Sequence, residues 1–149
     1  GAPINTHVTA GTCGPEQARF LIERAVAPEK IAIGHIQRNW DPWIQEQIVG
    51  LGAYVELDGT NRTKHVPDNA RVNLLKVLCE KGYGRQILLG TDAVKASDQK
   101  IYGSVAGIDY DPAVFCPRLI DDEGFDPDYV QDLLVGNAAT FFAFEPLAG

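Results

Sequence analysis

Short, mostly apolar runs alternate along the chain with stretches in which apolar residues recur every three or four positions. The short runs predict strands and the periodic stretches predict helices, because each repeat matches the geometry of its element. Strands that alternate with helices are typical of a parallel sheet, so we expect an α/β fold. The four predicted strands cover residues 3–8, 30–35, 53–58 and 86–92.

Proline next to a small or acidic residue marks the expected helix starts. An aspartate at the N-cap and a proline at the first helical position both favour helix initiation. Helical turns are also expected between residues 112 and 120, and Asn137 is predicted to cap a final helix that runs to Phe144. The four expected starts are Gly14-Pro15, Asp41-Pro42, Pro67-Asp68 and Asp126-Pro127.

The charge balance excludes some classes of partner. The chain has 13 basic and 20 acidic residues and a formal net charge of −7. A nucleic-acid-binding surface requires clustered lysine and arginine, whereas the densest basic group here is only Arg62, Lys64 and His65. No apolar stretch approaches the roughly 18 residues that a membrane-spanning helix requires. We therefore expect neither a nucleic-acid partner nor a membrane partner.

The three cysteines, Cys13, Cys79 and Cys116, are widely spaced and include no Cys-x-x-Cys pair. This spacing favours neither a disulfide framework nor a zinc knuckle. Because the sequence also begins without the basic and apolar pattern of a signal peptide, we expect a reducing, cytoplasmic location. The glycine motifs that bind nucleotides and the Gly-x-Ser-x-Gly elbow of serine hydrolases do not occur in the sequence.

Each predicted strand ends near a polar residue that can take part in chemistry, namely His7, His35, Asp58 and Asp92. Parallel strands point the same way, so these residues are expected on one edge of the sheet, where barrel enzymes have their active sites. Two imidazoles and two carboxylates suit a divalent metal such as zinc. A single histidine or aspartate at a strand end is more often structural, and Asp58 could simply tie down its loop. The coincidence of four such residues favours a functional site.

Five segments of the chain resemble the phosphotriesterase-related family of the amidohydrolase superfamily. They comprise the strand ends and a closing Gly-Asn-Ala-Ala-Thr-Phe-Phe motif, at residues 3–7, 33–35, 51–58, 87–92 and 136–142. Members of the family fold as a TIM (β/α)8 barrel with a two-metal centre. The resemblance implies that this chain is the C-terminal half of such a barrel, strands five to eight, with residues 1–149 as a single domain.

The resemblance also implies roles for the strand-end residues. His7 and His35 look like the two histidines on the more exposed metal. Asp92 looks like the aspartate that ligates the other metal and handles the proton of the bridging water, so it is the expected catalytic residue. A divalent metal cofactor is therefore expected, most simply zinc, and binuclear in the complete barrel. The strand-one His-x-His pair and the strand-four lysine of the family have no counterpart here.

The substrate is expected to enter between the loop at residues 60–66 and the long stretch at residues 93–109. Candidate substrate-binding residues are Asp58, Arg62 and His65. Where the best-known phosphotriesterases carry a histidine and an aspartate that relay protons, this chain has Gly59 and, near enough, Arg38. This departure favours the lactonase-like branches of the family, although phosphotriester, lactone and ester all fit the same metal chemistry.

Chain length shapes the remaining hypotheses. A complete barrel of this type needs about 250 residues, of which 149 residues would supply roughly four or five βα units. The main hypothesis is a metal-dependent hydrolase of a small-molecule substrate in the complete barrel. The alternatives are a catalytically inactive half-barrel fragment and a module that self-associates or binds a partner. The expected partner is the missing N-terminal half-barrel or a second copy of the chain.

Overall fold

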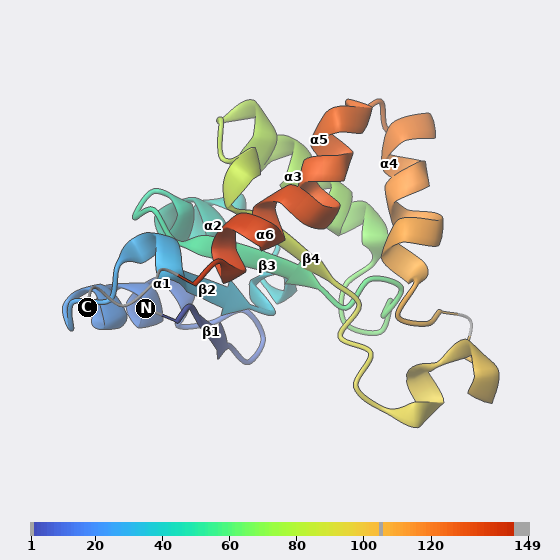
Figure 1. Cartoon of the computed structure of the whole chain (residues 1–149), viewed down its shortest axis with the longest axis horizontal. Coiled ribbons are helices and arrows are strands. Elements are labelled where there is room, and N and C mark those ends of the chain that lie inside the picture. The colour runs from blue at the N-terminus through green and yellow to red at the C-terminus, as the bar shows by residue number, and fades with distance from the viewer. Residues whose placement is uncertain (1, 105, 145–149) are drawn as a thin grey trace.

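The computed structural model describes residues 2–104 and 106–144. It contains one four-stranded parallel sheet in the order β1-β2-β3-β4 (Figure 1). All four predicted strands are confirmed, each shorter in total by one to three residues than the sequence pattern suggested. The strands are β1 (Ile4–His7), β2 (Ile31–Gly34), β3 (Tyr54–Asp58) and β4 (Ile87–Gly90).

Helices follow each strand, as the alternating pattern predicts. At two of the expected starts the aspartate is the N-cap: the carboxylate of Asp41 accepts a hydrogen bond from the amide of Trp43 at 3.0 Å, and Asp126 caps in the same way. The α-helices are α1 (Gly14–Ile22), α2 (Pro42–Val49), α3 (Asp68–Glu80), α4 (Cys116–Asp121), α5 (Pro127–Gln131) and α6 (Asn137–Phe142). Short 3-10 turns are η1 (Pro28–Lys30), η2 (Ile36–Arg38), η3 (Gly84–Gln86), η4 (Ala96–Asp98) and η5 (Lys100–Tyr102), and two π-helical segments are η6 (Asp111–Phe115) and η7 (Asp132–Gly136). None of these helices, in the part of the chain that the structure describes, is long and apolar enough to cross a bilayer.

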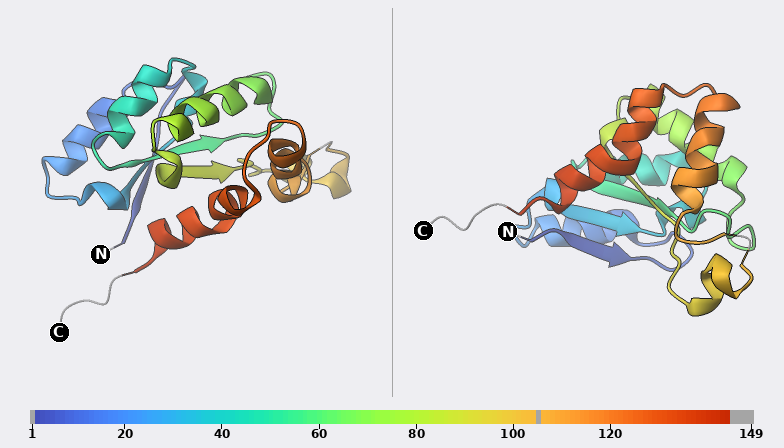
Figure 2. Two further views of the ribbon diagram at one scale, coloured as in Figure 1. Left: turned by 90° about the horizontal axis from the view of Figure 1, so that it is seen from above. Right: turned by 45° about the vertical axis from the view of Figure 1, so that its right-hand side comes forward.

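Helices α1, α2 and α3 cover one face of the sheet, as the left view of Figure 2 shows. Alternate strand residues point into this layer, because successive side chains of a strand lie on opposite faces. Ile33, Val55 and Ile87 are fully buried there against apolar side chains such as Ile48 and Leu75. This face is the outer face of a barrel wall, and its core holds the strands in place.

The opposite, inner face is apolar at one end and polar at the other. Near the amino-terminal ends of the strands, Tyr54 and Leu88 pack against Phe141 of α6, with 5.0 Å between the Tyr54 and Phe141 rings. Further along β3, the Glu56 carboxylate accepts a hydrogen bond of 2.9 Å from the side-chain amide of Asn5. The polar half of the inner face therefore leads directly to the carboxyl ends of the strands.

The predicted cap at Asn137 is wrong. This residue lies inside a continuous helical segment, with φ −62° and ψ −45°, and that segment ends at Phe142 rather than Phe144. Its buried side-chain amide instead donates hydrogen bonds to the carbonyl oxygens of Gly84 (2.9 Å) and Ile87 (2.8 Å). The physical reason is that carbonyls in η3 and at the start of β4 need a donor, and a mid-helix amide that faces the sheet supplies it.

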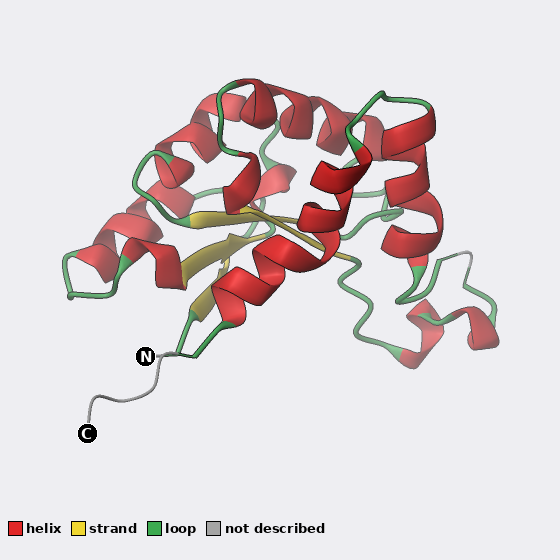
Figure 3. Cartoon of the chain, turned by 45° about the horizontal axis from the view of Figure 1, so that its top comes forward, coloured by secondary structure: helices red, strands yellow, loops and turns green. Residues whose placement is uncertain are grey.

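The connection from β4 to η6 is long and carries only two short turns, η4 and η5, among its described residues. Figure 3 shows it extending away from the sheet beyond the carboxyl ends of the strands. Loops of this length in a compact α/β protein are usually functional. The connection lies next to the carboxyl-terminal edge of the sheet. The candidate site predicted from the sequence is at the same edge.

Candidate metal centre and active site

The four strand-end residues meet in one pocket at the carboxyl ends of the strands. The pocket has a volume of about 290 Å³ and receives residues from all four strands or their ends. All three predicted metal ligands, His7, His35 and Asp92, line it, and so does Asp58. The full lining is Asn5, Thr6, His7, Gly34, His35, Glu56, Asp58 and Asp92. The parallel topology thus brings together residues that lie up to 87 positions apart in the sequence.

Three of these side chains can offer ligand atoms to one ion. One ligand atom each from His35, Asp58 and Asp92 lies within 4.8 Å of the others. His7 is not in that group of three but lies next to it, with its ring edge-on to the His35 ring and 4.4 Å between the ring centroids. A donor set of imidazole and carboxylate suits zinc and similar divalent ions. The residues present therefore fit a divalent cation.

Asp58 holds His35 in one orientation. Its carboxylate accepts hydrogen bonds from the His35 main-chain amide at 2.7 Å and lies 2.6 Å from His35 Nδ1. A carboxylate at Nδ1 places the ring proton there and leaves the Nε2 lone pair free for a metal. Asp58 is only 2% exposed, so in this structure its side chain faces His35. A direct contact between Asp58 and substrate stays a prediction.

Two side chains that the sequence analysis missed fix Asp58 in turn. Gln37 Nε2 donates to Asp58 Oδ1 at 3.0 Å and to the Asp58 carbonyl at 2.7 Å. Arg71 Nε donates to the same carbonyl at 2.9 Å, and its other nitrogens reach Gly59, Val66 and Asp68. Arg71 is fully buried on the apolar face of α3, four residues before Leu75. In the sequence, the signal that could have identified Arg71 is a charged residue at a position that the helical pattern assigns to the buried face of α3.

His35 and Asp92 share an unusual backbone conformation. Their φ angles are +61° and +52°, in the left-handed region that residues other than glycine rarely adopt. Such conformations cost free energy and cluster at functional sites, but Ala10, Cys13, Ala25 and Asn61 also adopt them and do not line this pocket. For His35 and Asp92 the strain falls on two residues of the same pocket, which agrees with a functional role.

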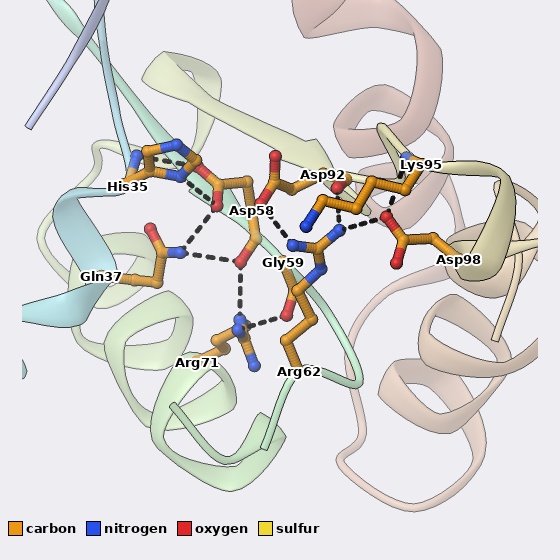
Figure 4. Close-up of polar contacts among 9 residues, drawn as sticks. All are labelled: His35, Gln37, Asp58, Gly59, Arg62, Arg71, Asp92, Lys95 and Asp98. Atoms are coloured by element: carbon orange, nitrogen blue, oxygen red, sulfur yellow. Dashed lines mark hydrogen bonds and ion pairs between the residues drawn. The ribbon is translucent and has the colours of Figure 1, made fainter. Parts of the chain in front are cut away.

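Asp92 is held by an ion-pair network on the other side of the pocket, as Figure 4 shows. Arg62 Nη1 lies 3.0 Å from Asp92 Oδ2, and Arg62 Nη2 contacts both the Asp92 carbonyl and Asp98 Oδ2, the latter at 3.0 Å. The amide of Lys95 also donates to Asp98 Oδ2, at 3.0 Å. The pKa of Asp98 is lowered, first by this amide and further by the Arg62 charge. Arg62 thus lies at the site, and its proposed contact with substrate stays a prediction.

His65 lies apart from these groups. It is exposed in the loop between β3 and α3 and is not among the residues that line the pocket. Partial desolvation, followed by the nearby charges of Arg38 and Lys64, lowers its pKa below the ordinary value of histidine. The structure therefore places His65 at the rim of the site rather than in it, and its role in substrate binding stays a prediction.

Comparison with known proteins agrees with this geometry. The family model of the phosphotriesterase family matches residues 1–142. A phospho-furanose lactonase from Mycoplasmopsis synoviae is 32% identical over 97% of this chain and 42% of its own length. The phosphotriesterase homology protein of Escherichia coli is 31% identical over 95% of the chain and 48% of its own. The chain therefore spans slightly less than half the length of these relatives.

Solved structures give the same result. The Escherichia coli phosphotriesterase homology protein, in complex with phosphate in its active site, superposes with a TM-score of 0.89 at 30% identity, over 95% of this chain and 48% of that one. A lactonase from Listeria monocytogenes gives a TM-score of 0.89 at 34% identity, over 97% of this chain and 45% of that one. The chain therefore belongs to the phosphotriesterase family and forms the C-terminal half of that family's barrel.

Proposed function

We propose that this chain supplies half of the active site of a hydrolase that opens lactones or related esters with a metal-activated water. The observation that carries the proposal is the meeting of His7, His35 and Asp92 in one pocket at the carboxyl ends of parallel strands, where His35 and Asp92 offer ligand atoms within 4.8 Å of each other. Similarity to two proteins named as lactonases supports the lactone as substrate class. The rest of the site would come from a complementary half-barrel.

Each residue has a distinct part in this proposal. His7, His35 and Asp92 would hold a divalent cation, with zinc the ion that best suits these ligands. Such a cation, when bound, lowers the pKa of a bound water and polarises the carbonyl of the substrate. Asp92 accepts the proton of the attacking water and returns it to the alkoxide that leaves when the ring opens. Asp58 orients His35 through Nδ1, and Gln37 and Arg71 keep Asp58 in place.

Lactones are favoured over phosphotriesters as the substrate class. By the resemblance to the family, Gly59 and Arg38 stand where efficient phosphotriesterases carry the two residues that relay protons. Without that relay, proton transfer depends on Asp92 alone, which suits a leaving group that stays tethered within the substrate. Opening of a lactone ring meets this condition, because the leaving alkoxide and the new carboxylate belong to one product molecule.

Substitution of Asp92 tests the proposal in the closed barrel. Asp92→Asn should leave folding intact and lower turnover of a γ- or δ-lactone by about 10²–10⁴-fold, because the amide cannot accept the proton. The matched control is Asp109→Asn, since Asp109 lies in the same connection but pairs with Lys100. Circular dichroism verifies folding. Unchanged lactone turnover in Asp92→Asn would contradict the role of this residue.

A second candidate function is association without catalysis. It is favoured by the sheet order, since β1 and β4 are the outer strands of the sheet in the described part of the chain. Outer strands carry unpaired amides and carbonyls that can bind another strand. In this reading the open edges bind a complementary half-barrel or a second copy, and the polar pocket has only a structural role.

Light scattering and metal analysis separate the two candidates. An association module should form a complex of defined mass that binds no zinc after zinc supplementation. The proposed hydrolase should bind zinc in the closed barrel and lose it when His35 is replaced by alanine. A complex that binds zinc but fails to open any lactone would support the proposed metal centre and refute the proposed reaction.

A further inference from the structure

We propose that Asp98 determines the substrate specificity of the site: by neutralising Arg62, it makes the pocket favour uncharged lactones over phosphorylated ones. This inference rests on the proposed function. It concerns the side of the pocket formed by the loop after β3 and the connection after β4. Arg62 lies on the first of these segments and Asp98 on the second.

The guanidinium of Arg62 is already engaged on both of its terminal nitrogens. Nη1 lies 3.0 Å from Asp92 Oδ2, and Nη2 lies 3.0 Å from Asp98 Oδ2 and also contacts the Asp92 carbonyl. Tight recognition of a phosphate by arginine uses two parallel N–H donors. A phosphate could therefore gain full access to Arg62 only by displacing a carboxylate.

Asp98 is better held for this role than an ordinary surface carboxylate. Its Oδ2 accepts the main-chain amide of Lys95 at 3.0 Å in addition to the Arg62 contact, which fixes it at the end of η4. Its side chain is 27% exposed and that of Arg62 is 25% exposed, so solvent screens the pair only in part. Because the loop itself orients the carboxylate, the contact loses little side-chain entropy on forming.

The location of the pair places it where a substituent of the substrate would lie. Arg62 and Asp98 both line a polar cavity of about 140 Å³. Thr91, the residue immediately before Asp92, lines the same cavity, so the cavity adjoins the pocket of the candidate metal ligands. A group attached to a lactone bound in that pocket would reach this cavity. Arg62 and Asp98 are the charged residues among those that line it, and their charges cancel. The cavity therefore offers a phosphate no uncompensated positive charge and accepts a neutral substituent.

The names of two similar proteins show why phosphate is the relevant group to test. One relative is named a phospho-furanose lactonase, and another was solved with phosphate in its active site. In this chain an anionic group that approaches Arg62 would meet the Asp98 carboxylate. Lys95 is exposed and its charge also acts on Asp98, but the side-chain ion pair of Asp98 is with Arg62, at 3.0 Å.

The test measures binding of inorganic phosphate to chelator-treated protein, so that no bound metal contributes to phosphate affinity. Asp98→Asn removes the charge while keeping an oxygen that can accept the Lys95 amide. We expect the dissociation constant for phosphate, from calorimetry or ³¹P NMR, to fall by about tenfold. Asp109→Asn is the matched control, because it removes the same charge from the same connection at a residue paired with Lys100.

Each outcome decides the proposal. Tighter phosphate binding by Asp98→Asn and not by Asp109→Asn supports it. Equal phosphate affinity in Asp98→Asn and the wild type would overturn it, and so would an equal gain in the control, which would indicate a general charge effect. If Asp98→Asn does not fold, Asp98→Ser replaces it, since serine can also accept the Lys95 amide.

A second readout links the result to the reaction. In the closed barrel, Asp98→Asn should lower the ratio of kcat/KM for an uncharged lactone to that for its phosphorylated analogue by about tenfold. If the wild-type barrel opens neither lactone, the proposed function fails, whereas the phosphate-binding result still decides the role of Asp98. The two failures are therefore distinguishable.

Discussion

The two sides of the candidate site hold their functional residues by different means. On one side, His35 is fixed by Asp58, which is itself bound by Gln37 and Arg71 in a buried network. On the other side, Asp92 pairs with Arg62 in a partly exposed network that joins two loops. The first network is made by elements that pack against the sheet. The second depends on long side chains and a connection with little secondary structure.

This difference indicates a division of tasks. Buried hydrogen bonds to a charged group position it closely, because leaving any of them unmade is costly. Partly exposed ion pairs contribute little to stability, yet they set the charge that an incoming molecule meets. We infer that the His35 side provides geometry for a metal ligand and that the Asp92 side adjusts which substrates approach. The following three predictions test this contrast in order of expected effect.

The largest effect is expected from Arg71→Ala. Arg71 is 1% exposed and donates to three main-chain carbonyls and to Asp68, so its loss leaves buried carbonyls without this donor and the Asp68 carboxylate without its positive partner. The free energy of unfolding, from urea denaturation, should fall by about 3–5 kcal/mol. The matched control is Arg118→Ala, which removes an arginine that is 30% exposed and paired with Glu123. A similar loss in both variants would show that the Arg71 network has no special part in stability.

An intermediate effect is expected from Asp58→Asn. Without the carboxylate at Nδ1, His35 loses the partner that fixes its tautomer and ring orientation. The affinity for zinc should therefore fall by about 10–100-fold, as is usual when such a partner is removed. Zinc titration of chelator-treated protein measures it. Asp111→Asn is a suitable control, because Asp111 is also buried but binds Thr60; an equal loss of zinc affinity there would contradict a specific effect on His35.

The smallest effect, and one of opposite sign, is expected from Arg62→Gln. Removal of a positive charge 3.0 Å from Asp92 should strengthen zinc binding by up to about fivefold, the equivalent of ~1 kcal/mol for a partly exposed pair. The free energy of unfolding should change by less than about 1 kcal/mol. The same zinc titration and urea denaturation apply. Weaker zinc binding would indicate that Arg62 supports the metal centre rather than competing with it.

The sequence predicts the fold and the shared edge well, for a clear physical reason. Parallel strands bring their carboxyl ends together whatever the intervening helices contain, so the position of His35 or Asp92 at a strand end is enough to place it. The supporting residues follow no such rule. Gln37 reaches Asp58 because a 3-10 turn after β2 redirects the chain, and the Arg62–Asp98 contact joins two loops across 36 positions. Contacts of this kind do not recur at a regular spacing along the chain, so the pattern of apolar and polar residues does not predict them.

The inner face contains one feature with a consequence for assembly. Gly34 and Gly90 flank Glu56 on neighbouring strands, and a Cβ at Gly34 would lie 2.9 Å from a Glu56 oxygen. Interior layers of an eight-stranded barrel receive side chains from alternate strands, so β2 and β4 leave one layer without any. Two identical halves related by twofold symmetry would bring two Glu56 carboxylates into that interior beside four glycines, and like charges that share a buried site are unfavourable. We therefore expect a non-identical half, without a second carboxylate at this level, to complete the barrel.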